Sequence, residues 1–368
     1  MTATDSALRP TWAEISLPAV ERNLLALRAA SGGKVMFVVK ANAYGHGAAR
    51  LARHAQDKGL CDFFGVSCIE EGAELRQAGI KLPILVLGSI YPFSAFADAL
   101  EADLSVTVAS IEAAANLVAE AARLGKKARC HIKVDTGMGR IGSRRPGAVK
   151  IAQLLAQSGS AKIEGIYTHL SSPDSDSAFT RLQLKHFDDT LADFAKLGID
   201  PGIRHAASSY PALHIPESRY DMVRPGIASY GLIDELEPAL TLKTRIVFIK
   251  DLRPGASVSY GRSYRCRKAT RVATIPIGYG DGWLRRLSNC GEALVGGVRC
   301  RIIGNVTMDM TMLDVSAVPE VHVGDEAVLL GKQGSDEITA QEVAALYGTI
   351  TYEVVTLLNL RVARKYIR

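Results

Sequence analysis

Eight short, mostly apolar segments alternate with helical patterns between residues 12 and 234, and this alternation limits the possible folds more than any other feature. The segments are Val35–Lys40, Phe63–Ser67, Ile84–Gly88, Leu104–Ala109, Ala128–Asp135, Ile163–His169, Ile203–Ala207 and Tyr220–Arg224. Most are apolar throughout, which is typical of parallel strands covered on both faces. Eight such strands in alternation with helices predict an α/β fold, a (β/α)8 barrel of the TIM type.

Helix signals fall in the intervals between these strands. Pro18 stands in the first turn of one predicted helix, and Ser110 precedes another. Glycines end three more helices: Gly79, Gly125 and Gly198. The seventh interval, residues 208–219, is short and gives the weakest helical pattern of the series.

The pattern changes after Pro238. β-Branched, roughly alternating segments follow at 239–252, 271–277, 292–298, 301–313 and 326–331, with one amphipathic helix at 340–346. We therefore predict two domains, a barrel over residues 12–236 and a mostly β C-terminal domain over residues 237–368. Residues 1–11 are expected to pack with the second domain.

Composition excludes several classes of protein. No apolar stretch approaches the roughly 20 residues that a membrane helix needs, and the first ten residues lack the pattern of an export signal, so we expect a cytoplasmic protein that binds no membrane. The net charge of +6 is mild, and the basic run Arg262–Arg271 is interpreted as a solvated strand and turn, not a nucleic-acid surface. The six cysteines form no CxxC pair, which favours free buried thiols and no metal site.

Polar residues follow the predicted strands at the ends where barrel enzymes carry their chemistry. They are Lys40, Asp135, His169, Ser208, Ser209 and Arg224. A lysine that ends an apolar strand loses solvation, which lowers its pKa and favours covalent chemistry with a carbonyl. Taken alone, Lys40 is better explained as a lysine that extends from a strand end to solvent, and the other polar residues at strand ends favour the chemical role.

Nine motifs in order then resemble the alanine racemase family over nearly the whole chain. They are Val39–Gly47 (VKANAYGHG), Lys133–Arg140 (KVDTGMGR), Thr168-His169, His205–Ser209 (HAASS), Val223–Ile227 (VRPGI), Val258–Gly261 (VSYG), Gly278–Gly282 (GYGDG), Met308-Asp309 and Tyr352-Glu353. Each motif is weak alone, whereas nine in the family's order are specific.

The resemblance implies a pyridoxal 5'-phosphate enzyme that interconverts L-alanine and D-alanine by exchange of the α-proton between two bases. Lys40 would hold the cofactor and act on one face of the substrate, and Tyr260 would act on the other. A free tyrosine has a pKa near 10, so Tyr260 would depend on a cationic neighbour such as Arg140. Without the resemblance, Tyr260 is better explained as an ordinary half-buried strand tyrosine.

The resemblance also assigns the cofactor contacts. Arg224 would donate to the pyridine nitrogen, and because a guanidinium is only a donor, that nitrogen would stay unprotonated. The alternative is a structural arginine paired with Asp221 or Glu217. His169 would stack under the ring and orient Arg224, or else be an ordinary core histidine. The residues implied around the phosphate are Tyr44, Ser209, Gly226, Ile227 and Tyr352.

Substrate contacts are implied at two further positions. Arg140 would pair with the substrate carboxylate, joined by the backbone N–H of Met308, whose side chain we expect in the core. Lys133 matches a lysine that is carbamylated in some family members. Ser208, Thr307 and Cys290 stand where asparagine, cysteine and arginine are common in relatives, and these departures bear on substrate breadth and affinity.

Assembly and biological role are implied by the family as well. A homodimer would share each active site between subunits, with Tyr260 and Met308 supplied by the partner. The D-alanine would serve peptidoglycan synthesis, although the sequence leaves a catabolic role open. The alternatives are a broader racemase for serine or lysine, a decarboxylase of similar architecture, and a non-catalytic cofactor-binding barrel.

Overall fold

We describe the protein from a computed structural model, in which residues 9–233 and 235–368 are described. The chain divides into two compact units. The barrel unit comprises residues 21–43 and 48–229, and the β unit comprises the described residues 9–20, 44–47, 230–233 and 235–368.

The barrel unit contains eight parallel strands, as predicted. They are β2 (Lys34–Val38), β3 (Phe63–Val66), β4 (Ile84–Val86), β5 (Ser105–Val108), β6 (Ala128–Lys133), β7 (Ala161–Tyr167), β8 (Ile203–His205) and β9 (Met222–Val223). They pair in the order β8-β7-β6-β5-β4-β3-β2-β9. The backbone N–H of Arg224 donates to Ala207 O at 2.9 Å, and that of Asp221 donates to Arg204 O at 3.0 Å, so β9 also meets β8. These bonds close the sheet into a barrel.

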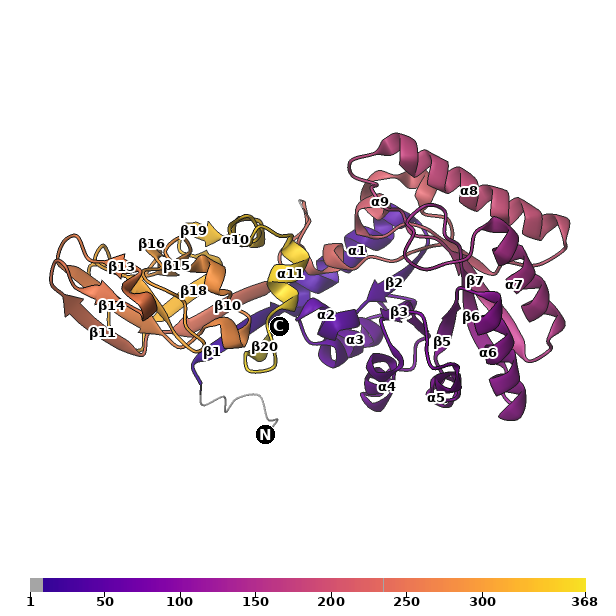
Figure 1. Ribbon diagram of the computed structural model, residues 1–368, viewed down its shortest axis with the longest axis horizontal. Coiled ribbons are helices and arrows are strands. Elements are labelled where there is room, and N and C mark those ends of the chain that lie inside the picture. The colour runs from indigo at the N-terminus through magenta and orange to yellow at the C-terminus, as the bar shows by residue number, and fades with distance from the viewer. Residues whose placement is uncertain (1–8, 234) are drawn as a thin grey trace. The chain divides into compact units, whose positions relative to one another are not determined.

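Helices connect the barrel strands, and α6, α7 and α8 are seen packed outside β6 and β7 (Figure 1). The helices from the N-terminal side onward are α1 (Leu17–Ser31), α2 (Lys40–Tyr44), α3 (Ala48–Asp57), α4 (Ile69–Gln77), α5 (Phe96–Glu101), α6 (Ile111–Arg123), α7 (Arg145–Gln157), α8 (Ser177–Lys196) and α9 (Ser209–His214). Ser110 caps α6 by accepting from Ala113 N at 3.1 Å, as its position predicted. The weak seventh interval forms only α9 and a single 3-10 turn.

The other described strands all lie in the β unit and form three sheets. The long sheet has the order β16-β15-β18-β10-β1-β20, with β19 beside β18, and the others are β11-β14-β17 and β12-β13. The strands are β1 (Thr11–Ser16), β10 (Leu240–Arg245), β11 (Phe248–Leu252), β12 (Ser257–Val258), β13 (Tyr264–Arg265), β14 (Thr270–Ile275), β15 (Glu292–Val295), β16 (Val298–Arg301), β17 (Thr311–Asp314), β18 (Glu326–Gln333), β19 (Asp336–Ile338) and β20 (Ala363–Ile367). The two helices are α10 (Ala340–Tyr347) and α11 (Thr351–Thr356).

Two sequence-based boundaries need correction. The barrel was predicted to begin at residue 12, but β1 pairs with β10 and β20, so residues 12–20 belong to the β unit. Of the N-terminal residues expected to pack there, 1–8 lie outside the described residues. The strand predicted over residues 301–313 is wrong in its middle, because a loop separates β16 from β17 and Gly304 adopts φ +78°. That loop carries Met308.

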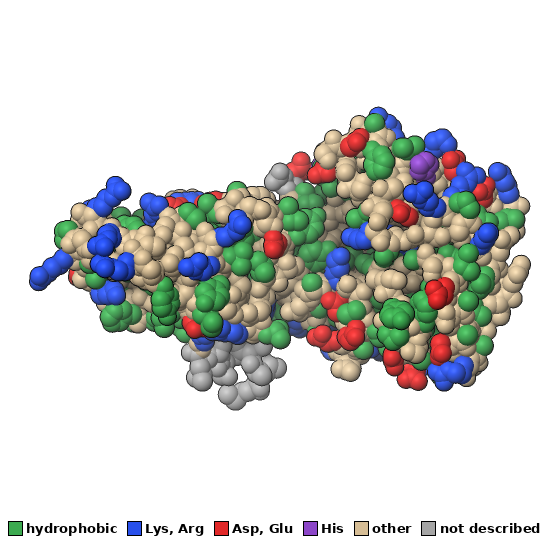
Figure 2. Space-filling model, in the orientation of Figure 1, with side chains coloured by type: hydrophobic (Ala, Val, Ile, Leu, Met, Phe, Trp, Pro, Cys, Tyr) green, Lys and Arg blue, Asp and Glu red, His purple; other side chains and the backbone are tan. Residues whose placement is uncertain are grey.

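Cysteine and charged side chains lie partly where the sequence indicated. All six cysteines are free, but Cys68 and Cys290 are exposed, so the expectation of buried thiols fails for these two. Lys and Arg side chains gather over β11, β13 and β14, where the run from Arg262 to Arg271 forms an exposed strand and turn (Figure 2). No helix among the described residues is both long and apolar enough to span a membrane.

Candidate active site

The first predicted site residue, Lys40, follows β2 and begins a strained turn. The next four residues, 41–44, all have φ between 51° and 54°, in the left-handed region that side-chain-bearing residues rarely adopt. Ala43 N donates to Val39 O at 2.7 Å, and Asn42 Oδ1 accepts from Ala48 N at 2.9 Å. Strain of this kind persists where the surrounding structure holds it, and it is concentrated at functional sites.

Sequence reasoning missed Glu71, which fastens this turn to the neighbouring strand end. Its Oε1 accepts from Ala41 N and its Oε2 accepts from Ser67 N, each at 2.6 Å. The same carboxylate faces Lys40 and favours its charged form. No pattern in the sequence distinguishes Glu71 from Glu70 beside it.

The electrostatics of Lys40 suit a nucleophilic amine. Burial lowers its pKa from the ordinary lysine value, and Arg140 and then Arg224 lower it further against the opposing effect of Glu71. A lysine with a depressed pKa is neutral, and so reactive toward carbonyl groups, over more of the neutral range.

Arg224 follows β9 and is a buried donor surrounded by acceptors. Its Nη2 donates to Thr168 O at 2.8 Å, Ala206 O at 3.0 Å and His169 Nδ1 at 3.2 Å. Its Nη1 lies 3.1 Å from His205 Nδ1. Burial lowers the pKa of Arg224 to about 10, which leaves it protonated at neutral pH. Among the residues that the structure describes, none accepts a hydrogen bond from Nε.

Arg224 is not the structural arginine, paired with Asp221 or Glu217, that the sequence left as an alternative. Asp221 pairs instead with Arg204, whose Nη2 lies 2.7 Å from Asp221 Oδ1. Arg224 therefore lacks a carboxylate partner among the described residues, and its buried charge is held by neutral acceptors alone.

Lys133 and Arg140, with Lys40 and Arg224, form a cluster of cations at the carboxyl ends of the barrel strands. Lys133 is buried, with Nζ 4.0 Å from the centroid of the Tyr167 ring. Burial, with Arg224 and Arg140 as the next causes, lowers its pKa well below the ordinary lysine value. Arg140 is exposed, and no described residue forms a hydrogen bond or ion pair with it. Such a cluster is suited to binding anions.

His169 ends the sixth predicted strand segment, and Ser209 follows the seventh at the start of α9. Burial, followed by the Arg224 charge, lowers the pKa of His169 well below its ordinary value, so the imidazole is neutral. Ser209 Oγ accepts from Gly226 N at 3.0 Å and from Ala228 N at 3.2 Å. These bonds hold the loop of Gly226 and Ile227 against the start of α9.

In the β unit, Tyr260 and Met308 lie on loops that are bonded to each other. Asn305 Nδ2 donates to Tyr260 O at 2.8 Å, and Ser259 Oγ donates to Asn305 O at 2.6 Å. Tyr260 is 74% exposed on a 3-10 turn, so it is not a half-buried strand tyrosine. Met308 is 53% exposed, which corrects the expectation of a core side chain. Within the described part of the chain, its backbone N–H has no acceptor.

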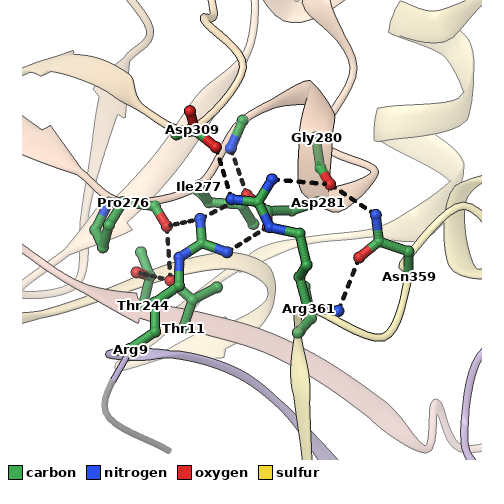
Figure 3. Close-up of polar contacts among 12 residues, drawn as sticks. Arg9, Thr11, Thr244, Pro276, Ile277, Gly280, Asp281, Asp309, Asn359 and Arg361 are labelled. Carbon is green, nitrogen blue, oxygen red and sulfur yellow. Dashed lines mark hydrogen bonds and ion pairs between the residues drawn. The ribbon is translucent and has the colours of Figure 1, made fainter.

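A charged network missed by sequence reasoning holds the Met308 loop (Figure 3). Asp281 has a fully buried side chain that pairs with Arg9, and its Oδ1 lies 3.3 Å from Arg361 Nε. Arg361 also donates to Asp309 Oδ1 at 2.6 Å. Gly280 N donates to Met308 O at 2.9 Å, and a Cβ on Gly280 would lie only 2.9 Å from that oxygen. The GYGDG loop and the Met308 loop are therefore fixed together.

Tyr44 and Tyr352 are also brought together in the β unit. Their ring centroids lie 6.1 Å apart, and Tyr44 lies 5.2 Å from the ring of Tyr230. Gly45 has φ +83°, and a Cβ there would stand 2.2 Å from Val355 O, so only glycine allows this segment to meet α11. The structure thus gathers Lys40, Lys133, Arg140, His169, Ser209, Arg224, Gly226 and Ile227 in the barrel unit, and Tyr44, Tyr260, Met308 and Tyr352 in the β unit.

Family models match both units. Residues 15–234 match the model described as "Alanine racemase, N-terminal domain", and residues 239–366 match "Alanine racemase, C-terminal domain". The chain is 46% identical to the alanine racemase of Symbiobacterium thermophilum, over 98% of this chain and 97% of that protein. It is 42% identical to the alanine racemase of Halothermothrix orenii, over 97% of each.

Solved structures agree with these matches. The crystal structure of alanine racemase from Bacillus anthracis with bound L-Ala-P superposes with a TM-score of 0.92 at 36% identity, covering 98% of this chain and 95% of that one. The alanine racemase of Clostridium difficile 630 gives the same TM-score and identity, covering 97% of this chain and 96% of that one.

Proposed function

This chain belongs to the alanine racemase family, and on that premise we propose that it interconverts L-alanine and D-alanine with pyridoxal 5'-phosphate as cofactor and two bases for the α-proton. The observation that carries the proposal is the environment of Lys40: an amine with a lowered pKa, beside Arg140 and Arg224, at the carboxyl end of a barrel strand.

The donors present fit the cofactor. Lys40 would hold its carbonyl carbon, Arg224 would donate from its unpartnered Nε to the ring nitrogen, and His169 would lie beneath the ring. Ser209, Gly226, Ile227, Tyr44 and Tyr352 would bind the phosphate. Bound cofactor would accept the electron pair that the departing α-proton leaves on the substrate carbon. Arg224 permits only a moderate withdrawal of that pair, because a donor-only guanidinium leaves the ring nitrogen unprotonated.

Two groups would move the proton from opposite sides of the substrate. Lys40 Nζ would remove or return it on one face, and Tyr260 Oη would do so on the other. Arg140 would bind the substrate carboxylate in a bidentate pair, and the unpartnered N–H of Met308 would add a further donor. Both fix the α-carbon between the two bases.

Lys133 is proposed to carry a carbamate. Carbamylation is the addition of an uncharged amine to dissolved carbon dioxide with release of one proton to solvent, and the depressed pKa of Lys133 supplies the uncharged amine. The product would place a negative charge among Arg140, Arg224 and Lys40, where the described residues offer only Asp135 and Glu71 nearby.

We further propose a cytoplasmic homodimer that supplies D-alanine for peptidoglycan and prefers alanine to larger substrates. Tyr44, Tyr279 and Tyr352 would crowd the entrance if they converge, so kcat/KM should be higher for alanine than for serine and small for lysine. Equal or better turnover of lysine would reject this pocket.

One assay tests the reaction itself. Purified protein is incubated with L-alanine in deuterium oxide, and both α-deuterium incorporation and D-alanine formation are followed. We expect both to appear in wild type and to be lost in Lys40→Ala. Release of carbon dioxide would identify a decarboxylase, and absence of any exchange by protein that carries cofactor would overturn the proposal. Borohydride reduction should fix the cofactor mass to the peptide that contains Lys40.

A further inference from the structure

Three side chains, His205, His131 and Glu164, extend in sequence from the buried Arg224 toward the opposite end of the barrel. His205 Nδ1 lies 3.1 Å from Arg224 Nη1, and His205 Nε2 lies 2.9 Å from His131 Nδ1. His131 Nε2 lies 3.2 Å from Glu164 Oε2. Both histidines are fully buried, and Glu164 is 13% exposed. Each contact falls within hydrogen-bond distance, so the four groups form one continuous chain.

A local irregularity of the sheet makes this chain possible. The register between β6 and β7 shifts between Cys130 and His131, so that Glu164 is the extra residue on β7. A bulge of this kind re-aims a side chain, and here the Glu164 carboxylate also accepts from Ser105 Oγ. Next to it, a Cβ on Gly165 would stand 2.4 Å from His131 Nδ1. Only glycine at 165 leaves room for the His131 ring at this place.

The two end groups of this hydrogen-bond chain, Arg224 and Glu164, determine which ring nitrogen of each histidine carries the proton. Arg224 can only donate, so His205 Nδ1 accepts. Burial, followed by the Arg224 charge, lowers the pKa of His205 well below its ordinary value, so the ring is neutral and carries its proton on Nε2. That N–H donates to His131 Nδ1, which leaves the His131 proton on Nε2. The final acceptor is a carboxylate: burial opposes the charge of Glu164, but the bonds from His131 and Ser105 prevail and lower its pKa.

We propose that His131 and Glu164 are positioning residues, which fix the tautomer of His205 and thereby hold the Arg224 guanidinium in place for the cofactor ring. This inference rests on the proposed function for the role of Arg224 toward the cofactor, whereas the proton arrangement follows from the contacts alone. If His131 lost its acceptor, its proton could move to Nδ1. The His205 ring would then turn an N–H toward Arg224, and two donors would face each other.

The test compares Glu164→Leu with Glu164→Gln in the holoenzyme. NMR of isotope-labelled ring nitrogens identifies the tautomer of each histidine. In wild type, His131 and His205 should both carry the proton on Nε2. Glu164→Gln should keep this pattern, because its amide oxygen still accepts from His131, and Glu164→Leu should lose it. An exposed residue on α6, Glu112, gives the control Glu112→Leu, which should change neither histidine.

A second measurement follows the cofactor. Glu164→Leu should shift its absorbance and lower kcat by roughly threefold to tenfold with little change in KM, the size expected for one weakened hydrogen bond, and Glu164→Gln should restore both. If Glu164→Leu does not fold, His131→Phe removes the same acceptor from His205 with a ring of similar size. A wild type without cofactor absorbance would refute the proposed function. A normal wild type whose variants keep the His205 tautomer and the absorbance would refute this inference.

Discussion

The Nη1 nitrogen of Arg224 and the Nδ1 nitrogen of His205 are joined by a hydrogen bond of 3.1 Å. With Thr168 O, Ala206 O and His169 Nδ1, His205 completes a set of four acceptors around one guanidinium. The cation therefore organises the carboxyl ends of three neighbouring strands, independently of what it does for a ligand.

Arg224→Met should therefore destabilise the fold as well as impair function. The substitution leaves four buried neutral acceptors without their donor, and loss of the partner from a buried polar group typically costs about 1–3 kcal/mol. The free energy of unfolding from denaturant titration should fall by that amount. Arg123→Met, on the exposed surface of α6, is the control and should have little effect. Equal losses in the two variants would contradict the stabilising role of Arg224.

Glu71→Ala should loosen the left-handed turn after Lys40. Both carboxylate oxygens accept backbone N–H groups, from Ala41 and Ser67, and we expect a loss of about 1–2 kcal/mol after allowing for partial exposure. Because Glu71 favours the charged form of Lys40, its removal should also lower the Lys40 pKa further. Thermal unfolding and the pH dependence of cofactor attachment measure the two effects. The neighbouring Glu70→Ala should change neither.

Lys133 should make stability depend on pH in a defined direction. Its pKa is far lower in the folded chain than the 10.5 of an ordinary lysine, so between those two values the unfolded chain binds one more proton. Stability then rises with pH by up to about 1.4 kcal/mol per unit, until the pH passes 10.5. In carbonate-free buffer, Lys133→Met should remove this rise.

The control for Lys133 is Lys196→Met, on an exposed lysine at the end of α8. It should reproduce the wild-type slope. A wild-type curve that matches Lys133→Met over this range would mean that Lys133 is charged in the folded protein, and it would also remove the basis for carbamylation.

Asp281→Leu should destabilise the β unit, because it leaves Arg9 and Arg361 facing a buried site without their shared carboxylate. We expect a loss of about 1–3 kcal/mol, because Asp281 is buried but both arginines reach solvent and keep part of their hydration. Asp309→Asn changes the half-exposed partner of Arg361 and should lower the free energy of unfolding by less. Hydrogen exchange at Gly280, whose N–H bonds to Met308 O, should accelerate in Asp281→Leu and stay close to wild type in Asp309→Asn.

The barrel and its strand-end residues could be predicted because they follow from local patterns. An apolar run that ends in a polar residue places Lys40, His169 and Arg224 without any tertiary information. The Met308 loop was mistaken for a strand because its apolar residues alternate, while the break at Gly304 depends on a close approach to Val258 and Ser259. The one-residue shift in the pairing of β6 with β7, which places Glu164 beside His131, could not be predicted from the sequence either, because register depends on the partner strand.

Contacts between distant segments explain the other omissions. Asp281 was visible only as part of a motif, and its pairing with Arg9 joins residues 272 positions apart. Glu71 acts through two backbone N–H groups, and backbone donors are the same at every residue. Side chains that bind backbone or distant charges therefore cannot be identified from one sequence, whereas side chains that end buried strands can.

We expect each active site to draw residues from two subunits. Lys40, Arg140 and Arg224 belong to the barrel unit, while Tyr260 and Met308 lie on exposed loops of the β unit. We expect a C2 dimer in which the β unit of one chain completes the barrel site of the other, so that two identical composite sites form. Lys40→Ala and Tyr260→Phe should each be nearly inactive as homodimers. A mixed dimer has one site that lacks both bases and one that retains both.

Exchange of subunits between the two inactive variants should therefore restore activity, approaching about a quarter of wild type for a statistical mixture of dimers. Half of the dimers are then mixed, and half of their sites are intact. If each chain instead used its own Tyr260, every site would lack one base and exchange could restore nothing. Mass spectrometry establishes that mixed dimers have formed, and absorbance establishes that they carry cofactor. Mixed dimers that meet both conditions and remain inactive would refute the shared site.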